Sequence, residues 1–582
     1  MLKTLGAQVK EYKTASFLTP VFMLLEVAME TIIPLLMASI INKGVNTGNT
    51  RHIYIMGVWM VVAALFSLFC GLMGAKFGAK ASMGLGKNLR KAMFEMIQTY
   101  SFANIDKFST AGLVTRLTTD VTNIQNSYQM ILRMAMRAPA SIICAMTMSF
   151  FISPQLATIY LVAVIFLSIA LIFISTRAMK YFQAAFEKYD ELNESVQENV
   201  SAIRVVKAYV REAYEKTRFH KAARNIYDVF TKAESLVIFN MPLMMFTVYS
   251  CILLISWFGA HLVVDSVLET GDLMALLTYC MNILMNLMML TMIFVMISMS
   301  MASAKRICEV LNEESTLHNP ENPEYNVENG DIRFENVSFR YSKTAEAPVL
   351  DHINLEIKSG ETIGIIGGTG SSKTSLVNLI SRLYDVDEGA VYVGGKDVRD
   401  YDMDALRNQV SVVLQQNVLF SGSIYDNLRW GDANATDEEC QVACRMACAD
   451  EFISRFPDGY NTHIEQGGTN VSGGQKQRLC IARALLKKPK ILILDDSTSA
   501  VDTATDAKIR KAFKEAIPGT TKLIIAQRIS SVMDADRIIV LHDGKLDGFG
   551  THEELLETNT IYRDVYDSQT NGGGDFDEGG AA

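Results

Sequence analysis

The segment ETIGIIGGTGSSKTSLVNLI, residues 361–380, decides the fold of the C-terminal half of the chain. Its apolar beginning, ETIGIIG, predicts a strand, and SLVNLISRLY, residues 375–384, predicts a helix. Between them, GGTGSSKT has the spacing of a Walker A P-loop, except that Ser372 replaces the glycine before the lysine. Backbone N–H groups of such a loop can bind phosphate oxygens at the helix N-terminus. Lys373 would then reach the β- and γ-phosphates of a nucleotide, and Thr374 would ligate Mg²⁺.

Two further motifs follow the P-loop. KILILDD, residues 490–496, predicts a buried strand that ends in Asp495, which fits a Walker B carboxylate for magnesium. VSGGQ, residues 471–475, precedes KQRLCIARALL, which has the pattern of a helix. The C-terminal half is therefore expected to be an α/β domain that binds a nucleotide.

The N-terminal half has a different character. Up to about residue 301 it consists of long apolar stretches rich in Met, Leu and Ile. A run of about 20 apolar residues can cross a bilayer as a helix. Six such runs are present, at residues 15–41, 53–77, 130–152, 155–175, 237–263 and 273–301. Because 582 residues are too many for one core, the sequence predicts a multi-domain chain, with an all-α six-helix membrane domain before the α/β domain.

The distribution of Lys and Arg gives the expected orientation. Two long polar connections, residues 78–128 and 176–236, carry most of the basic residues of this half, whereas the other side has little more than Lys43 and Arg51. The positive-inside rule places the N-terminus, both connections and the C-terminal domain in the cytoplasm. The N-terminal segment lacks a small-residue cleavage site before its long apolar run, so we expect a retained first span, not a signal peptide.

Composition argues against several other classes of protein. The net charge is −9 and there is no Lys/Arg-rich block, which argues against a nucleic-acid partner. The nine Cys are scattered and none forms a C-x-x-C pair, so neither a zinc site nor a disulfide framework is indicated.

The order and spacing of P-loop, VSGGQ and Walker B strand resemble the nucleotide-binding domain of ABC transporters. The membrane half is similar too, because DKFSTAGLVTRLTTDV (residues 106–121) and SVQENVSAIRVVKAYVREAYEKTRF (residues 195–219) resemble the intracellular loops of ABC exporters. In that family, short coupling helices in these loops dock on the ATP domains. The resemblance implies a transmembrane domain at 1–310, a linker at 311–329 and an ATP-binding domain with a helical subdomain at 330–568. The Gly-rich, acidic composition of the C-terminus predicts a disordered tail at 569–582.

The same resemblance assigns site residues. Tyr341 would stack on adenine, Gln415 would sense Mg²⁺ as the Q-loop residue, and Gln527 would occupy the switch position. STSAVD, residues 497–502, fits the D-loop, which ends in Asp502. The expected cofactors are ATP and Mg²⁺, with Thr374, Gln415 and Asp495 on the metal and Asp496, Gln527 and Gln415 in catalysis. The nucleotide-binding set is Tyr341, Gly367, Gly368, Thr369, Gly370, Ser371, Ser372, Lys373, Thr374, Ser375, Gln415, Ser472, Gly473, Gly474, Gln475 and Asp502.

Two catalytic positions depart from the family pattern. Asp496 stands where the family has the Glu that polarises the attacking water, and Gln527 stands where it has the His that contacts the γ-phosphate. A carboxylate one methylene shorter and a neutral amide are both expected to weaken hydrolysis. With Ser372 they resemble the degenerate-site subunit of heterodimeric multidrug-type exporters, whose intact signature would serve the competent site of a partner subunit. The alternative is a homodimer that Asp496 and Gln527 merely slow.

Charged residues inside the predicted spans are costly and therefore candidates for function. Glu26 and Glu30 lie four residues apart on one helix face, as do Arg133 and Arg137 on another. Two interpretations stay open: ion pairs that lock two helices together, or a Glu that faces the pathway and binds a cation.

The sixth predicted helix carries methionines on one face, in steps of three or four residues. They are Met281, Met285, Met288, Met292, Met296 and Met299. Met is flexible and polarisable, so this face could line a cavity for varied hydrophobic substrates. Ordinary helix packing or lipid contact is the alternative.

The expected function is ATP-driven export of hydrophobic or amphipathic, drug-like compounds across the plasma membrane by one half of a heterodimer. Lipids, peptides or lipopeptides are alternative cargoes, import of a metal chelate is a more distant one, and a regulatory ATP sensor attached to a channel is a different class. An ATP-powered DNA-repair or translation factor would share the ATP domain, but six spans argue against it.

Overall fold

The computed structural model describes residues 1–343, 345–496 and 501–571. The chain divides into two compact units, the first formed by Met1–Thr99 and Phe108–Glu313 and the second by Tyr100–Lys107 and Glu314–Ala582. The short segment Tyr100–Lys107 therefore groups with the C-terminal unit, although its neighbours on both sides belong to the first.

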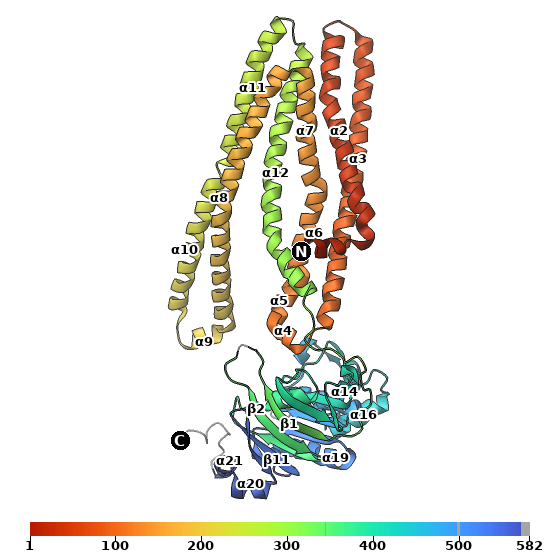
Figure 1. Ribbon diagram of the computed structural model, residues 1–582, viewed down its shortest axis with the longest axis vertical. Helices are drawn as coiled ribbons and strands as arrows, with labels where there is room; N and C mark the ends of the chain where they lie inside the picture. The colour runs from red at the N-terminus through yellow and green to blue at the C-terminus, as the bar shows by residue number, and fades with distance from the viewer. Residues whose placement is uncertain (344, 497–500, 572–582) are drawn as a thin grey trace. The chain divides into compact units, whose positions relative to one another are not determined.

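The regular elements described in the first unit are all helices, joined by short turns (Figure 1). Six of its helical stretches are long and apolar enough to cross a membrane, as the sequence predicts. The helices are α1 (Leu2–Ala7), α2 (Lys13–Ser39), α3 (Thr50–Gln98), α5 (Thr110–Thr115), α6 (Val121–Met130), α7 (Met136–Ile152), α8 (Pro154–Ser201), α9 (Ile203–Ala208), α10 (Glu212–Val237), α11 (Asn240–Val264) and α12 (Thr270–Leu311). The π-helical turns η2 (Ile40–Val45), η3 (Arg116–Asp120) and η4 (Ile131–Ala135) continue α2, α5 and α6.

The long polar connections are continuations of the spans. At about 1.5 Å per residue, the 49 residues of α3 measure roughly 73 Å, more than twice the thickness of a bilayer core. The helix α8 continues in the same way, and α9 joins it to α10 in a tight reversal (Figure 1). The break between α7 and α8 falls at Ser153, because Pro154 suits the first turn of a helix and cannot continue the preceding one.

Large side chains form the core of this bundle. Tyr160, Leu276, Tyr279 and Ile283 are fully buried between α8, α11 and α12. The Tyr279 hydroxyl donates a hydrogen bond to the Thr31 carbonyl at 2.6 Å, which ties α12 to α2.

The second unit is built on a six-stranded sheet in the order β12-β11-β3-β10-β9-β6. Its neighbours pair in parallel except β11 and β12, which are antiparallel. The strands are β3 (Thr362–Ile366), β6 (Val410–Val413), β9 (Ile491–Asp495), β10 (Thr521–Ile525), β11 (Arg537–His542) and β12 (Lys545–Gly550). The central strands are buried on both faces, which explains their continuous apolar sequences.

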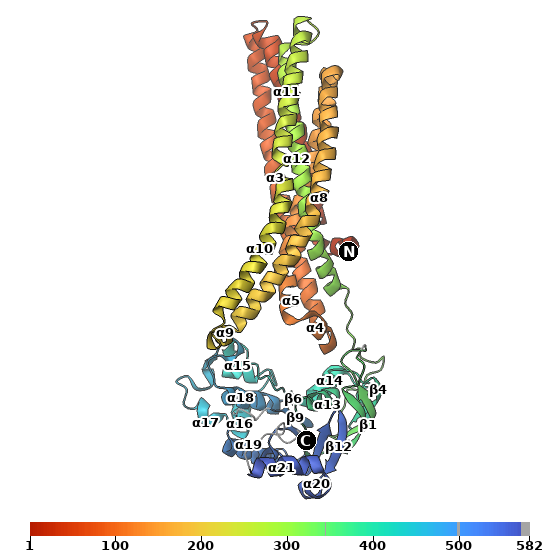
Figure 2. The same ribbon diagram turned by 90° about the vertical axis from the view of Figure 1, so that its left-hand side faces the viewer.

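Smaller elements surround this sheet. An antiparallel sheet has the order β2-β1-β4-β5, and helices α15 to α18 gather at the other end of the unit (Figure 2). The strands are β1 (Ile332–Phe339), β2 (Leu350–Ile357), β4 (Glu388–Val393), β5 (Lys396–Asp397), β7 (Gly422–Ser423) and β8 (His463–Ile464). The helices are α4 (Phe102–Phe108), α13 (Lys373–Ile380), α14 (Met403–Gln409), α15 (Ile424–Leu428), α16 (Asp437–Met446), α17 (Asp450–Ile453), α18 (Gly473–Leu486), α19 (Thr503–Ala516), η7 (Ile529–Ser531), α20 (His552–Thr558) and α21 (Thr560–Asn571).

The P-loop helix is shorter than the sequence predicts. Instead of running to residue 384, α13 ends at Ile380, and Arg382 adopts a left-handed conformation with φ 49°. The Arg382 N–H donates to the Leu379 carbonyl and the Leu383 N–H to the Asn378 carbonyl, which is the Schellman pattern of helix termination. Glycine usually takes this position, so no sequence signal marks the stop.

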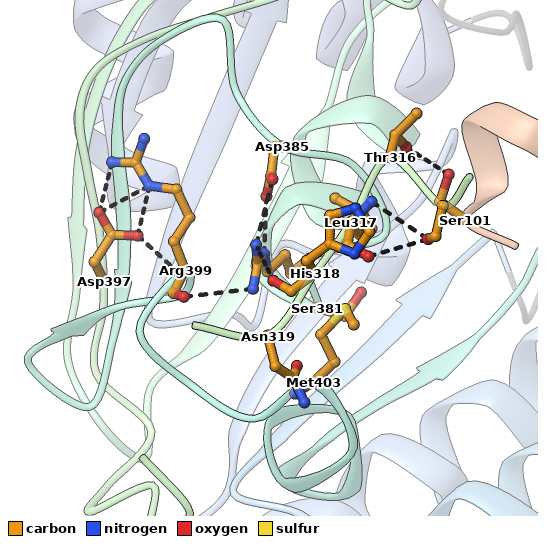
Figure 3. Close-up of polar contacts among 12 residues, drawn as sticks. Ser101, Thr316, Leu317, His318, Asn319, Ser381, Asp385, Asp397, Arg399 and Met403 are labelled. Carbon is orange, nitrogen blue, oxygen red and sulfur yellow. Dashed lines mark hydrogen bonds and ion pairs between the residues drawn. The ribbon is translucent and has the colours of Figure 1, made fainter. Parts of the chain in front are cut away.

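Arg382 stays in this conformation because its buried side chain is fully engaged. Figure 3 shows the residues that it bonds, Asp385, His318 and Arg399. Its guanidinium donates to Asp385 Oδ1 at 2.8 Å, to the His318 carbonyl at 3.1 Å and to the Arg399 carbonyl at 3.4 Å. The segment around His318 is thereby fastened to the end of α13. Thr316 in the same segment bonds the Ser101 hydroxyl at 2.6 Å.

The C-terminal helix corrects the predicted start of the tail. α21 continues through Asn571, so residues 569–571, expected to be disordered, are helical. Residues 572–582 lie outside the described residues.

Candidate nucleotide-binding site

The P-loop lies between β3 and α13, as the sequence predicts. Gly370 and Ser372 both have positive φ, 84° and 74°, and Ser372 is the N-cap of α13. Left-handed residues in a loop that leads into a helix N-terminus are typical of anion-binding sites. A Cβ on Gly367 would lie 2.4 Å from the Leu541 carbonyl oxygen, so only glycine fits there. Lys373 Nζ donates to the carbonyls of Gly367 and Gly368 at 2.7 and 2.9 Å.

Two predicted metal ligands meet at the ends of β9 and the P-loop. Thr374 Oγ1 donates to Asp495 Oδ2 at 2.9 Å. Asp495 is only 3% exposed, and burial raises the pKa of its carboxyl, although the hydrogen bond from Thr374 and the charge of Lys373 oppose this shift. A buried carboxylate beside a hydroxyl offers the oxygen ligands that Mg²⁺ prefers, and magnesium would supply the compensating positive charge. The donor set therefore fits Mg²⁺ with a nucleotide phosphate.

Tyr341 lies beside the first turn of α13. Its hydroxyl is 2.8 Å from Ser375 Oγ, and its half-exposed ring meets the Tyr384 ring edge-on at 5.1 Å between centroids. Phe339 supports the same ring at 4.9 Å. An exposed aromatic face next to a phosphate-binding loop suits a stacked base.

The two catalytic positions that differ from the family pattern, Asp496 and Gln527, lie next to each other. Asp496 directly follows β9 and Gln527 follows β10, and these strands are parallel neighbours. Gln527 Nε2 is 3.4 Å from Asp496 Oδ2. Asp496 has φ 47°, and its N–H donates to the Ile525 carbonyl at 3.1 Å, which fixes the start of the turn.

The other predicted residues occupy separate segments of the same unit. Ser472 caps α18 in a capping box with Gln475, so the signature presents a well-ordered helix N-terminus, with Gly473 and Gly474 in its first turn. Gln415 is exposed just after β6. Residues 497–500 of the predicted D-loop lie outside the described residues, and Asp502 caps α19 by accepting from the Thr505 N–H at 3.0 Å.

Sequence patterns did not reveal two residues at this site. Tyr384 touches the Tyr341 ring, and Gln569 hydrogen-bonds the backbone at Gln527 and Ile529. Neither belongs to a recognised motif, because Tyr384 lies beyond the end of α13 and Gln569 reaches Gln527 from 42 residues further along the chain.

Three of the four charged residues singled out inside the predicted spans form ion pairs, and Arg133 has a buried Nε without a hydrogen-bond partner among the described residues. Arg137 Nη2 is 2.7 Å from Glu30 Oε1 and 3.7 Å from Glu26 Oε1, so one guanidinium joins α7 to two turns of α2. This is the arrangement that the ion-pair interpretation predicts.

Comparison with known proteins identifies the class. Residues 16–288 match the ABC transporter transmembrane region and residues 350–499 match the ABC transporter family. The chain is 37% identical over 560 residues to an uncharacterized ABC transporter ATP-binding protein, YfiB, of Bacillus subtilis, covering 96% of this chain and 97% of the relative. The chain therefore belongs to the ABC transporter family.

A further relative and a solved structure share the same arrangement of domains. An ATP-dependent lipid A-core flippase of Desulfotalea psychrophila is 31% identical, covering 83% of this chain and 84% of the relative. The fold matches a bacterial Atm1-family ABC exporter solved with ATP bound, with a TM-score of 0.82 at 23% identity, covering 96% and 99% of the two chains. The chain therefore has the fold of an exporter-type half-transporter. It is a multi-pass membrane protein whose ATPase is coupled to transport.

Proposed function

We propose that this chain is the degenerate-site half of a heterodimeric exporter that moves hydrophobic or amphipathic compounds out across the plasma membrane. The observation that carries the proposal is the meeting of Asp496 and Gln527, 3.4 Å apart at the ends of adjacent strands. Because its side chain is one methylene shorter than glutamate, the Asp496 carboxylate would lie about 1 Å too far from the attacking water. Gln527 is a neutral amide that cannot take up a proton.

The signature supports the second part of the proposal. Ser472 to Gln475 keep the residues and the capped helix N-terminus that a partner's nucleotide needs. In a head-to-tail pair, this signature would close over the partner's P-loop while the partner's signature closes over Lys373. Turnover at the partner's site would then reset an alternating-access cycle that the coupling helices pass to the membrane helices.

Two features of the membrane unit favour a hydrophobic cargo. Met281, Met285, Met288 and Met292 are exposed on one face of α12 within this chain, whereas the side chain of Met299 lies outside the described residues. A cavity of about 430 Å³ between α8 and α12 is lined by aliphatic side chains, Phe294 and four hydroxyls, with no charged group among its described lining residues. Such a lining suits neutral or weakly amphipathic molecules.

The test is transport by the chain and its partner in liposomes, measured with a fluorescent hydrophobic cation. Asp496→Asn should leave ATP-dependent transport nearly unchanged, whereas amidation of the partner's corresponding carboxylate should abolish it. When the partner carries the amide, Asp496→Glu combined with Gln527→His in this chain should restore ATP hydrolysis. Gln527→His alone should restore much less. Equal loss from Asp496→Asn, or full ATPase activity of this chain alone, would contradict the heterodimer.

Lipid translocation is the second candidate, favoured by the likeness to the lipid A-core flippase. The same liposomes with a fluorescent phospholipid distinguish it, because ATP-dependent movement of the lipid without movement of the cation would favour a flippase. A regulatory ATP sensor would move neither compound.

A further inference from the structure

The C-terminal helix α21 packs directly on the segment that carries the switch residue. Tyr562 and Val565 are buried in the same core as Ile529 and Val532. The Tyr562 hydroxyl is 2.6 Å from His552 Nδ1, which joins α21 to the start of α20. The helix is thus fixed against the turn η7 that follows Gln527.

One side chain of α21 holds the backbone on both sides of this turn. Gln569 Nε2 donates to the Gln527 carbonyl at 2.9 Å, and Gln569 Oε1 accepts from the Ile529 N–H at 2.9 Å. A single side-chain amide therefore fixes two backbone groups that are two residues apart. Its nitrogen acts as the donor and its oxygen as the acceptor.

The switch residue itself is held much less firmly by its own side chain. Ala526 is buried and its N–H donates to the Ile365 carbonyl at 3.3 Å, so the sheet fixes the chain up to that point. Gln527 is exposed, and its amide reaches Asp496 only at 3.4 Å. The direction of the Gln527 side chain thus depends on the orientation of its own backbone, whose carbonyl accepts a hydrogen bond from Gln569.

We propose that Gln569 is a positioning residue for the γ-phosphate contact: it sets the backbone at Gln527 and Ile529 so that the Gln527 amide can meet the terminal phosphate of ATP. This proposal rests on the switch role of Gln527 in the proposed function. The γ-phosphate is present in ATP and absent from ADP, so Gln569 should act on the preference for ATP over ADP and not on nucleotide binding in general.

The experiment compares four variants of the full-length chain in detergent, of which Gln527→Ala is the reference for loss of the switch side chain. Gln569→Met keeps the length of the side chain and removes both hydrogen bonds, Gln569→Glu keeps the acceptor for the Ile529 N–H, and Thr570→Ala alters the exposed next residue as a control. Hydrogen exchange of a peptide containing Ile529 reports the turn, and equilibrium binding of ATP and ADP with Mg²⁺ reports the site.

The expected result for Gln569→Met is exchange of the Ile529 amide roughly tenfold faster, because two hydrogen bonds are lost. The affinity for ATP should fall several-fold while that for ADP stays unchanged, and Gln569→Glu should lie between. Thr570→Ala should match the wild type in both measurements.

Two outcomes would overturn the proposal. An unchanged ATP-to-ADP ratio in Gln569→Met, together with a lowered ratio in Gln527→Ala, would show that the switch works without Gln569. Equal weakening of ATP and ADP would show that Gln569 only stabilises the domain. A Gln527→Ala variant with a normal ratio would instead contradict the switch role itself.

Discussion

The Tyr384 hydroxyl donates a hydrogen bond to Asp106 Oδ2 at 2.8 Å, which joins α4 to the aromatic group beside the P-loop. The Phe102 ring of α4 approaches the same tyrosine at 6.1 Å between centroids. Tyr384 in turn meets Tyr341, whose hydroxyl reaches Ser375 in the first turn of α13. One tyrosine thus connects a segment of the first long connection with the expected adenine platform.

Replacing Tyr384 by Phe tests this connection. The ring and its contact with Tyr341 are kept, so ATP affinity should stay within about twofold, whereas loss of the hydrogen bond should cost about 1 kcal/mol. We expect unchanged basal ATPase activity and a weaker stimulation by transport substrate, measured in liposomes. Tyr325→Phe, at an exposed tyrosine of the same unit, is the control. Undiminished stimulation in Tyr384→Phe would contradict a role for this bond in coupling.

The ion pair of Arg137 with Glu30 makes a different prediction. Arg137→Met leaves two carboxylates without their shared cation, which should cost on the order of 3–5 kcal/mol and reduce the yield of folded protein. Adding Glu26→Met and Glu30→Gln should recover much of the loss, because the two carboxylates that lack their cation are then gone. Thermal unfolding in detergent measures both steps. If the triple variant folds well but loses only the transport of cations, a Glu acts on cargo instead.

Sequence patterns predicted the features that depend on neighbours along the chain. The strand before Gly367, the helix that follows VSGGQ and the six apolar helices follow from local periodicity and spacing, and the structure has them. The end of α13 was placed too late, because Arg382 takes a left-handed conformation that only its buried hydrogen bonds to distant carbonyls explain. Gln569 was assigned to a tail for the same reason, since its partners lie some 40 residues earlier.

Ser372 carries a backbone conformation that glycine adopts more easily. Its φ of 74° costs a residue with a Cβ about 1 kcal/mol relative to glycine, so Ser372→Gly should stabilise the ATP domain by up to that amount. Ser371→Gly is the matched control. Ser371 is buried and has no positive φ, so its replacement should destabilise the domain instead. Thermal unfolding of both variants measures the difference, and equal effects would show that Ser372 is not strained.

Asp495 should carry a stability cost that depends on pH. Burial raises the pKa of the Asp495 carboxyl in the folded chain above the unfolded value of about 3.9. The folded chain therefore favours the neutral carboxyl, and the stability that this form contributes is lost as the pH rises through the folded pKa. Asp495→Asn removes the buried charge and keeps an acceptor for Thr374 Oγ1. We therefore expect a higher midpoint of thermal unfolding, by about 2–4 °C, for the nucleotide-free protein at pH 7.5.

The gain should shrink as the pH is lowered, because the wild-type carboxyl then becomes neutral as well. Asp495→Asn should also abolish the extra stabilisation that Mg²⁺ with ATP gives the wild type, since the amide supplies no negative charge to the metal. Asp547→Asn, outside the site, is the control for removing a carboxylate, and its effect should not depend on Mg²⁺. A gain from Asp495→Asn that is the same at every pH would mean that shape, and not the buried charge, accounts for the change.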